Sequence, residues 1–389
     1  MACSARWRSE RDNPPPRRVV VADARIAADA AYRLACEGTA MLWRGDFQSA
    51  RQLLQALTRR VEAGPRNASA ASKPADTSPG AAFHRHRQAQ SQRARTLATV
   101  LLPLGDDHGI SLRRAPDVRQ ACAEVYGPAE GPSVVSLREL LGLVGAHEWR
   151  TKGVEVPALA GHIHPHYGVF SPTRGEYVEL VATARTATMS LATMSMATIS
   201  LAFDIGTGTG VLAAVLARRG VQRVVATDQD ARALACAREN IARLGLAAQV
   251  EVLEADLFPA GRAPLVVCNP PWIPARPGAP IERAIYDPEC GMLRAFLAGL
   301  AEHLTPDGEG WLILSDIAEH LGLRSRAELL AMFAAAGLEV VGRDDVRPQH
   351  PRAADTSDPL HAARSAELTS LWRLRVAALA GSSIKGSAC

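Results

Sequence analysis

The second half of the chain alternates short apolar runs with helical patterns, and this alternation limits the folds that it can adopt. Seven strands are predicted at 201–206, 221–228, 249–256, 263–269, 310–316, 338–346 and 370–379. Helical patterns lie at 210–220, 231–245, 289–304 and 326–337. Asp287 followed by Pro288 predicts a cap for the third helix, and Ser325 with Glu328 predicts a capping box for the fourth. The sequence therefore predicts an α/β fold with a mostly parallel seven-stranded sheet covered on both faces.

A glycine-rich turn, DIGTGTG, lies where the first of these strands runs into the first helix. Its glycines let the backbone approach a ligand closely, and the helix N-terminus offers free N–H groups. The second and third strands end in acids, and ligands of open α/β sheets bind at such carboxyl ends. The predicted cofactor site consists of Asp204, Gly206, Gly208, Gly210, Asp228 and Asp256.

A dinucleotide site is the alternative interpretation of this turn. The fingerprint G-x-G-x-x-G/A, started at Gly206, would need glycine or alanine at the position of Val211. The form G-x-G-x-G after an acid instead resembles the class I S-adenosylmethionine-dependent methyltransferases. The resemblance implies a Rossmann-like domain with S-adenosyl-L-methionine as cofactor.

The same resemblance implies a role for each residue. Asp204 would lie near the methionine amino group, and Gly206 and Gly208 would lie against the cofactor. Asp228 would accept the ribose hydroxyls, and Asp256 would lie near the adenine.

The fourth strand ends in a stiff turn, VVCNPPW, at Asn269, Pro270, Pro271 and Trp272. Two prolines fix two φ angles and remove two backbone donors, so no central strand continues through them. Asn269 faces the same crevice as the glycine turn, so it is predicted to contact both cofactor and substrate. Its carboxamide oxygen and the Pro270 carbonyl can accept hydrogen bonds from a planar NH₂ group, and the Trp272 ring can stack on it. The alternative is a turn with a structural role only.

This turn resembles the N-P-P-[FYW] motif of methyltransferases that act on planar nitrogens, among them release-factor glutamine methyltransferases and ribosomal RNA and DNA amino methyltransferases. The segment 167–181 stands where the glutamine enzymes carry a proline- and glutamate-containing segment. Arg174, Glu176 and Tyr177 are therefore candidates, with Pro271 and Trp272, for binding the substrate. Trp272 departs from the tyrosine usual in the glutamine enzymes.

These features predict a methyltransferase that modifies a glutamine side chain in a protein or an exocyclic amine of a nucleic-acid base. A binding module that keeps the fold and cofactor without turnover is the alternative; the intact Asn269 argues against it. The three histidines of HIHPHY (162, 164 and 166) suggest a metal only weakly, because no cysteine or acid accompanies them at ligand spacing. No metal is expected.

The domain organisation is predicted from composition. Residues 1–22 read as a disordered basic tail, 23–63 as a helical hairpin and 64–82 as a flexible linker. A helical and strand region at 83–165 would select the substrate, and a methyltransferase domain would follow at 166–380, with a tail at 381–389. Three near-copies of one pentapeptide at 186–200 are predicted to be a loop insertion.

Charge and cysteine content bear on partners and location. The first hundred residues hold 17 basic against 8 acidic side chains, which suits RNA or an acidic partner, although a charge run is usually a solvated face. The bulk of the region before the methyltransferase domain also favours a macromolecular substrate. The basic N-terminus lacks an apolar core, no run suits a membrane span, and seven scattered cysteines form no C-x-x-C pair, so a cytoplasmic protein is expected.

Overall fold

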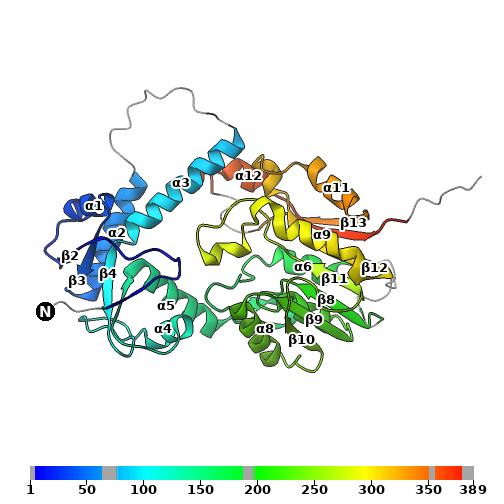
Figure 1. The fold of residues 1–389 in the computed structure, drawn as a ribbon, viewed down its shortest axis with the longest axis horizontal. Helices are drawn as coiled ribbons and strands as arrows, with labels where there is room; N and C mark the ends of the chain where they lie inside the picture. The colour runs from blue at the N-terminus through cyan, green and yellow to red at the C-terminus, as the bar shows by residue number, and fades with distance from the viewer. Residues whose placement is uncertain are drawn as a thin grey trace, which may run out of the picture.

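The computed structural model describes residues 5–63, 76, 78–186, 196, 198–349 and 355–378. Within these residues the chain forms an N-terminal and a C-terminal domain, each built on its own sheet (Figure 1). Separate clusters of buried apolar side chains stabilise the two domains.

The C-terminal domain contains a seven-stranded sheet in the order β10-β9-β8-β11-β12-β14-β13. Its strands are β8 (Leu201–Ile205), β9 (Arg223–Asp228), β10 (Val250–Glu254), β11 (Ala263–Cys268), β12 (Leu304–Ser315), β13 (Leu338–Val346) and β14 (Thr369–Val376). All pairs are parallel except those that β14 makes with β12 and β13. The predicted mostly parallel seven-stranded sheet is confirmed. β8 has β9 on one side and β11 on the other, so the strand order reverses at β8. Such a switch point places a ligand crevice at the carboxyl ends of these strands.

Helices cover both faces of this sheet. The helices α6 (Glu176–Thr183), α7 (Val211–Arg218) and α8 (Ala231–Arg243) contribute to one apolar cluster, and α9 (Gly291–His303) and α11 (Arg326–Ala335) to another. Two short helices, α10 (Ile317–His320) and α12 (His361–Ala366), pack near the start of α3 (Pro79–Leu97).

Of the two predicted helix caps, the capping box is confirmed, whereas α9 begins at Gly291, after Cys290, rather than directly after Asp287. Ser325 and Glu328 form the capping box of α11. The Asp287 carboxylate accepts hydrogen bonds from the backbone N–H groups of Met292 and Leu293, at 2.9 and 3.1 Å. A short 3-10 turn, Pro288–Cys290, separates this acid from the start of α9.

The N-terminal domain contains a five-stranded sheet in the order β1-β5-β4-β3-β2. Its strands are β1 (Arg6–Arg8), β2 (Arg18–Ala22), β3 (Thr39–Trp43), β4 (Val100–Leu104) and β5 (Ser133–Ser136). The helices α1 (Ala28–Cys36), α2 (Phe47–Ala63), α4 (Arg119–Tyr126) and α5 (Leu137–Lys152) complete its core with the end of α3. A two-stranded ribbon, β6 (Val154–Val156) and β7 (Gly161–Ile163), leads into the C-terminal domain.

Two predictions for this domain are wrong. Residues 1–22 were expected to be disordered, but β1 and β2 lie within the described part of that segment. Residues 23–63 were expected to be a helical hairpin, but Thr39–Trp43 is a strand that pairs with both β2 and β4. A buried five-residue apolar run next to helix-forming residues cannot be distinguished from a helical turn by periodicity alone. The N-terminal region is therefore α/β rather than helical.

Other predicted segments are only partly described. Residues 64–75 and 77, most of the predicted linker, lie outside the described residues, as does the tail 381–389, and α3 begins at Pro79 inside the predicted linker. The pentapeptide segment connects α6 to β8 as predicted, but 187–195 and 197 are not among the described residues. The end of the segment nearest β8 is not a solvent-exposed loop, because Met196 and Ile199 are buried in the core of the C-terminal domain.

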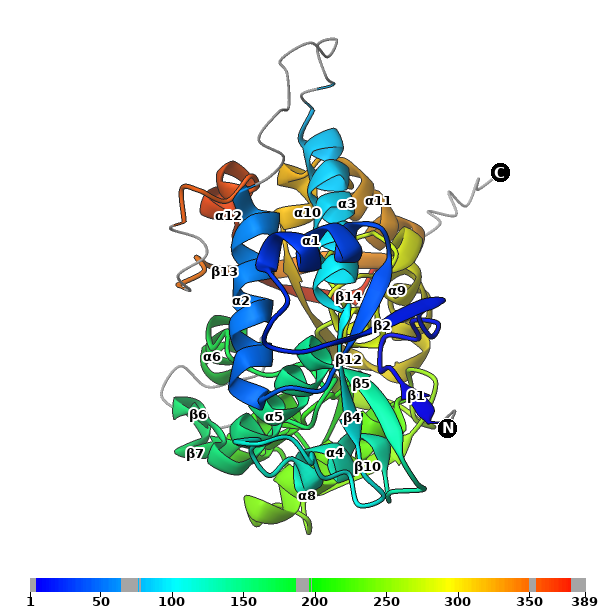
Figure 2. The ribbon, with the colours of Figure 1, turned by 90° about the vertical axis from the view of Figure 1, so that its left-hand side faces the viewer.

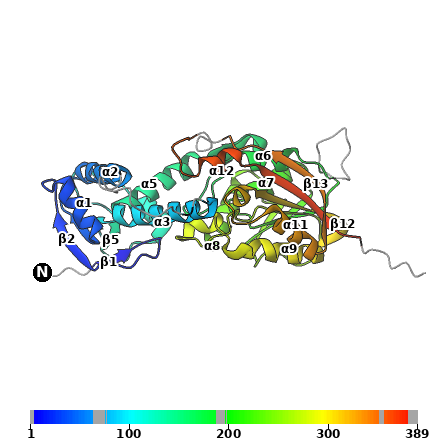
Figure 3. The same cartoon turned by 90° about the horizontal axis from the view of Figure 1, so that it is seen from above.

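Helix α3 links the two domains (Figures 1 and 3). Its last residue, Leu97, belongs to the N-terminal core, whereas Phe83 near its start packs with Ile317 and Leu360 of the C-terminal domain. Figure 2 shows the helix from the side of the N-terminal domain, beside α2. The Arg87 guanidinium lies 3.9 Å from the centre of the Tyr286 ring and donates to Glu282, which ties α3 to the loop after the Asn-Pro-Pro-Trp turn.

Candidate active site

A cleft of about 2220 Å³ lies between the two domains. Most of the residues predicted for the cofactor and substrate line it. These residues are Arg174, Tyr177, Gly206, Gly208, Asp228, Asp256, Asn269, Pro270, Pro271 and Trp272. Asp204, Gly210 and Glu176 do not line it.

The glycine turn between β8 and α7 forms part of the cleft wall. Gly206 and Gly208 have φ values of 70° and 55°, a left-handed conformation that favours glycine. A Cβ on Gly206 would lie 2.8 Å from the Cε of Met292, so a side chain there would fill the space at the cleft wall. The absence of a side chain at Gly206 and Gly208 leaves the backbone at these two positions open to a ligand.

Asp204 and Gly210 act on the turn from the protein side. The Asp204 carboxylate is buried and accepts hydrogen bonds from the Thr207 hydroxyl, at 2.6 Å, and from the Ala213 N–H, at 3.0 Å. Burial raises the pKa of Asp204 to about 6. A Cβ on Gly210 would lie 3.3 Å from the Cα of Ala237, so this glycine permits close packing against α8. The described positions therefore give both residues a role in shaping the turn rather than facing the cleft.

Two acids follow the neighbouring strands. Asp228, the last residue of β9, accepts hydrogen bonds from the Gly208 and Asp230 N–H groups, both at 3.0 Å. Burial raises the pKa of Asp228. Asp256 lies just beyond β10 and lines the same cleft. These two carboxylates and the backbone of the glycine turn offer the acceptors and donors that a ribose and an adenine need, so the donor set fits an adenosine-containing cofactor.

The Asn-Pro-Pro-Trp turn follows β11, the strand next to β8. The Trp272 indole N–H donates to the Asn269 carboxamide oxygen at 2.9 Å. This bond holds the carboxamide orientation and uses one of the two lone pairs of that oxygen, so a second acceptor direction stays open. The prediction treated Trp272 only as a stacking surface, and the structure adds a contact to Asn269.

An ion pair of Arg174 with the buried Glu367 lies against the Trp272 ring. The Arg174 guanidinium carbon lies 5.6 Å from the ring centre, and its nitrogens donate to the Glu367 carboxylate at 3.2 and 3.3 Å. Glu367 is 2% exposed and also accepts from the Ser315 hydroxyl at 2.7 Å. The sequence analysis missed Glu367, because it lies far along the chain from the turn and in no local motif. Glu176, predicted at the site, instead lies 3.8 Å from the Arg174 Nε, out of the cleft.

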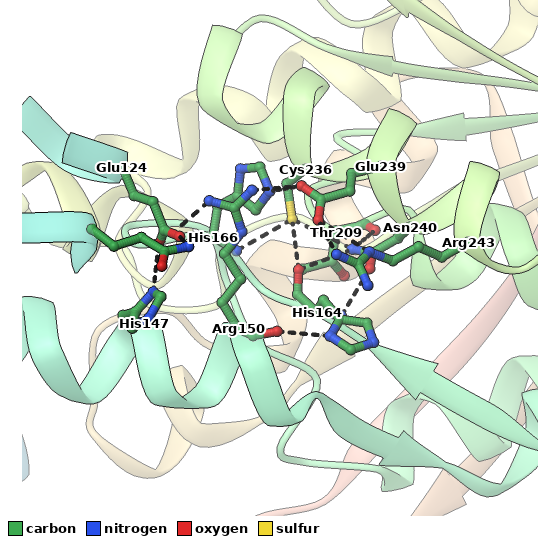
Figure 4. Close-up of polar contacts among 11 residues, drawn as sticks. Glu124, His147, Arg150, His164, His166, Thr209, Cys236, Glu239, Asn240 and Arg243 are labelled. Carbon is green, nitrogen blue, oxygen red and sulfur yellow. Dashed lines mark hydrogen bonds and ion pairs between the residues drawn. The ribbon is translucent and has the colours of Figure 1, made fainter. Parts of the chain in front are cut away.

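A polar network joins the domains at one end of the cleft (Figure 4). Glu239 of α8 accepts from Arg150 of α5 at 2.6 Å and contacts the His166 ring nitrogen at 2.7 Å. Burial alone would raise the pKa of Glu239, but hydrogen bonds from His166, Arg243 and Arg150 lower it to about 2. His166, which the sequence suggested as a weak metal ligand, thus contributes to an interdomain contact. Among the described residues, no group of three or more His, Cys, Asp or Glu side chains is arranged to hold a metal ion.

The sheet order, the glycine turn, the spaced acids and the Asn-Pro-Pro-Trp turn together define a class I S-adenosylmethionine-dependent methyltransferase domain. Comparison with known families agrees. Residues 162–336 match the family model of the methyltransferase small domain.

Named relatives share this region. A release factor glutamine methyltransferase from Cereibacter sphaeroides is 38% identical over 146 residues, which are 36% of this chain and 49% of the relative. A ribosomal protein L11 methyltransferase from Pelotomaculum thermopropionicum is also 38% identical over 146 residues, 37% of this chain and 39% of the relative. The chain thus spans about half or less of the length of these relatives.

A solved structure of a ribosomal protein L11 methylase from Lactobacillus delbrueckii subsp. bulgaricus is 15% identical. The structural match covers 53% of this chain and 79% of the chain in that structure, with a TM-score of 0.34. In the part of the chain that the structure describes, no helix is long and apolar enough to cross a membrane.

Proposed function

We propose that this protein is an N-methyltransferase that transfers a methyl group to a planar NH₂ nitrogen of a macromolecule, either a glutamine side chain or an exocyclic amine of a nucleic-acid base. One observation carries the proposal. The Asn269 carboxamide, held by Trp272, lies in the same cleft as the glycine turn of the cofactor site.

The chemistry that this turn can perform follows from its acceptors. An amide or aromatic amine nitrogen delocalises its lone pair, so it is a weak nucleophile while it stays planar. The free lone pair of the Asn269 oxygen and the Pro270 carbonyl can each accept one N–H of the NH₂ group, which orients the nitrogen and favours its pyramidal form. S-adenosyl-L-methionine, when bound, supplies a methyl group on a positively charged sulfur. The leaving group is a neutral thioether, so the chain needs no general acid, and the nitrogen loses one proton to water after it accepts the methyl group.

The surrounding residues position these acceptors. Pro270 and Pro271 stiffen the turn, and stiffness matters where catalysis depends on alignment. The Trp272 ring offers a face to a planar group, and Arg174 lies over that ring. Tyr177, buried at the start of α6, lines the cleft nearby.

Cofactor contacts belong to the same proposal. The backbone at Gly206 and Gly208, together with Asp228 and Asp256, would hold the adenosine portion, and Asn269 would lie between cofactor and acceptor. Asp204 and Gly210 would contribute by shaping the turn.

A macromolecular substrate is supported by the size of the cleft and by the N-terminal domain that forms one of its walls. The two relatives are named for methylating a release factor and a ribosomal protein. A cytoplasmic location is part of the proposal, since such partners are cytoplasmic and since Cys36, Cys122, Cys236, Cys268 and Cys290 are free thiols.

The experiment compares the wild-type protein with Asn269→Ala. Radiolabelled S-adenosylmethionine is added with each to an extract of cells that lack the protein, and the products are treated with protease or with nuclease. The wild type should label a macromolecule. Asn269→Ala should lower the rate by roughly 100-fold, the scale of losing a positioned catalytic acceptor, and should lower the cofactor affinity measured by calorimetry far less. Label that resists both treatments and runs as a small molecule would refute the macromolecular substrate. Cofactor binding without any labelled product would favour a binding module without turnover.

A further inference from the structure

The cleft has a second wall, formed by the N-terminal domain, that the proposed chemistry does not use. Helix α5 lines it with Arg138, Gly142, Ala146 and Trp149. Their spacing of four, four and three positions places them on one face of the helix. A cation stands at one end of this strip and an indole at the other, with two small residues between them.

Trp149 is unusually accessible for its type. It is 53% exposed although it lines the cleft. A large aromatic side chain that the protein leaves half in solvent, in a cleft, provides a stacking surface for a planar ligand group. The small side chains of Gly142 and Ala146 leave the approach to it along α5 unobstructed.

The cations of this wall lack acidic partners. Arg138 and Arg11 are exposed and line the cleft, and no carboxylate of the described residues lies within ion-pair distance of either. Two guanidinium groups on one cleft wall, with no carboxylate of the described residues within ion-pair distance, favour an anion beside them.

Helix α3 extends the same wall with a basic surface. Its sequence contains four arginines and two histidines but no acid. Gln90, Ser91 and Arg95 of this helix line the cleft and are exposed. Amide, hydroxyl and guanidinium groups are the side chains that contact phosphates and sugars most often.

Charge differs between the two sides of the cleft. The lining of the N-terminal wall has four basic and two acidic side chains, a net charge of +2: Arg11, Arg87, Arg95, Arg138, Glu37 and Glu139. The opposite side has three basic and five acidic side chains, a net charge of −2: Arg174, Arg283, Arg364, Asp228, Asp230, Asp256, Glu282 and Glu367. A polyanion would be attracted to the N-terminal wall and repelled by the cofactor side. The strip from Arg138 to Trp149 is about 16 Å long at the rise of an α-helix, which corresponds to four or five stacked nucleotides at about 3.4 Å each.

We propose that this wall binds single-stranded nucleic acid, with phosphates on Arg11, Arg95 and Arg138 and a base stacked on Trp149. The inference rests on the proposed function and narrows it. The methyl acceptor is then an exocyclic base amine rather than a protein glutamine.

The test measures binding by fluorescence anisotropy at several salt concentrations, with a short labelled single-stranded RNA and a DNA of the same sequence. Arg11→Ala/Arg138→Ala should reduce the slope of log K against log salt by about 1.4, or about 0.7 for each lost phosphate contact. At about 0.1 M salt this equals roughly 25-fold weaker binding. Trp149→Ala should weaken binding without changing the slope. The matched control is Arg51→Ala/Arg59→Ala, two exposed arginines of α2 outside the cleft, which should change neither quantity.

Each outcome decides the inference. Failure of the folded wild type to bind either oligonucleotide would overturn it, as would an equal loss in the control pair. If Arg11→Ala/Arg138→Ala produces protease-sensitive label at the wild-type rate, the inference about this wall is wrong, although the proposed function stands. Oligonucleotide binding that depends on Arg11 and Arg138, with neither a methylated base nor a methylated protein among the products, would support nucleic-acid binding by this wall and contradict the proposed function. The better-bound oligonucleotide identifies RNA or DNA as the ligand.

Discussion

Gly208 and Gly210 share a left-handed backbone but face different surroundings, so alanine at each position should have a different effect. Their φ values are 55° and 82°. An alanine in this region costs about 1–2 kcal/mol. At Gly208 the new methyl group would meet only Val169 Cγ1, at 4.0 Å, and would extend into the cleft. At Gly210 it would lie 3.3 Å from both Cα and Cβ of Ala237, which adds about 1–3 kcal/mol of overpacking.

Thermal unfolding and calorimetric titration with S-adenosylmethionine separate the two effects. We expect Gly210→Ala to lower the melting temperature about twice as much as Gly208→Ala, at roughly 2–4 °C per kcal/mol for a domain of this size. We expect Gly208→Ala to weaken cofactor binding by at least about 10-fold, or 1.4 kcal/mol, and folded Gly210→Ala to bind within about 3-fold of the wild type. Equal loss of affinity in both folded variants, or normal affinity in Gly208→Ala, would refute the placement of these glycines.

Three further predictions concern single side chains. Asp228→Ala should weaken S-adenosylmethionine binding by roughly 1.5–3 kcal/mol, the scale of hydrogen bonds to a charged group; unchanged affinity by calorimetry would mean that the ribose site lies elsewhere. Burial raises the pKa of Asp204 from 3.8 to about 6, so the stability that its protonated form provides is complete below pH 3.8 and is lost as the pH rises through about 6. Asp204→Asn should therefore flatten the dependence of melting temperature on pH in this window, a difference of up to about 3 kcal/mol, and a retained slope would contradict the assignment. Glu367→Gln should remove the charge partner of Arg174, which lies against Trp272, and should therefore lower the rate of methyl transfer several-fold at unchanged cofactor affinity. A loss of stability of roughly 1.5–3 kcal/mol with normal turnover would show that the Arg174–Glu367 pair has a structural role only.

The cofactor half of the site could be predicted from sequence because its signals are local. The residues from Asp204 to Gly210 join a strand to a helix, and the following strands end in acids at short intervals. Parallel strands bring their carboxyl ends to one edge, so the residues that follow them must lie close together. The turn at Asn269 was also predictable from a local signal, since two successive prolines after a buried apolar run remove two backbone donors and prevent a central strand from continuing.

The direction in which each of these residues faces was decided by tertiary packing. Gly208 and Gly210 are equivalent in the motif, yet only Gly208 lines the cleft, because α8 packs against Gly210. Glu367 reaches Arg174 only because the sheet places β14 beside β12, which brings segments far apart in the chain together.

The N-terminal domain shows what local patterns could not determine. Its composition predicted a tail and a helical hairpin, but β1 pairs with β5 and β3 lies between β2 and β4. Short buried strands carry no alternation that distinguishes them from helix, and their partners lie far along the chain. The sequence alone determined the class of the second domain and its cofactor. The tertiary structure decided that the first domain is a sheet whose helices form the opposite wall of the cleft, because that arrangement depends on pairing between distant segments rather than on the pattern within any one of them.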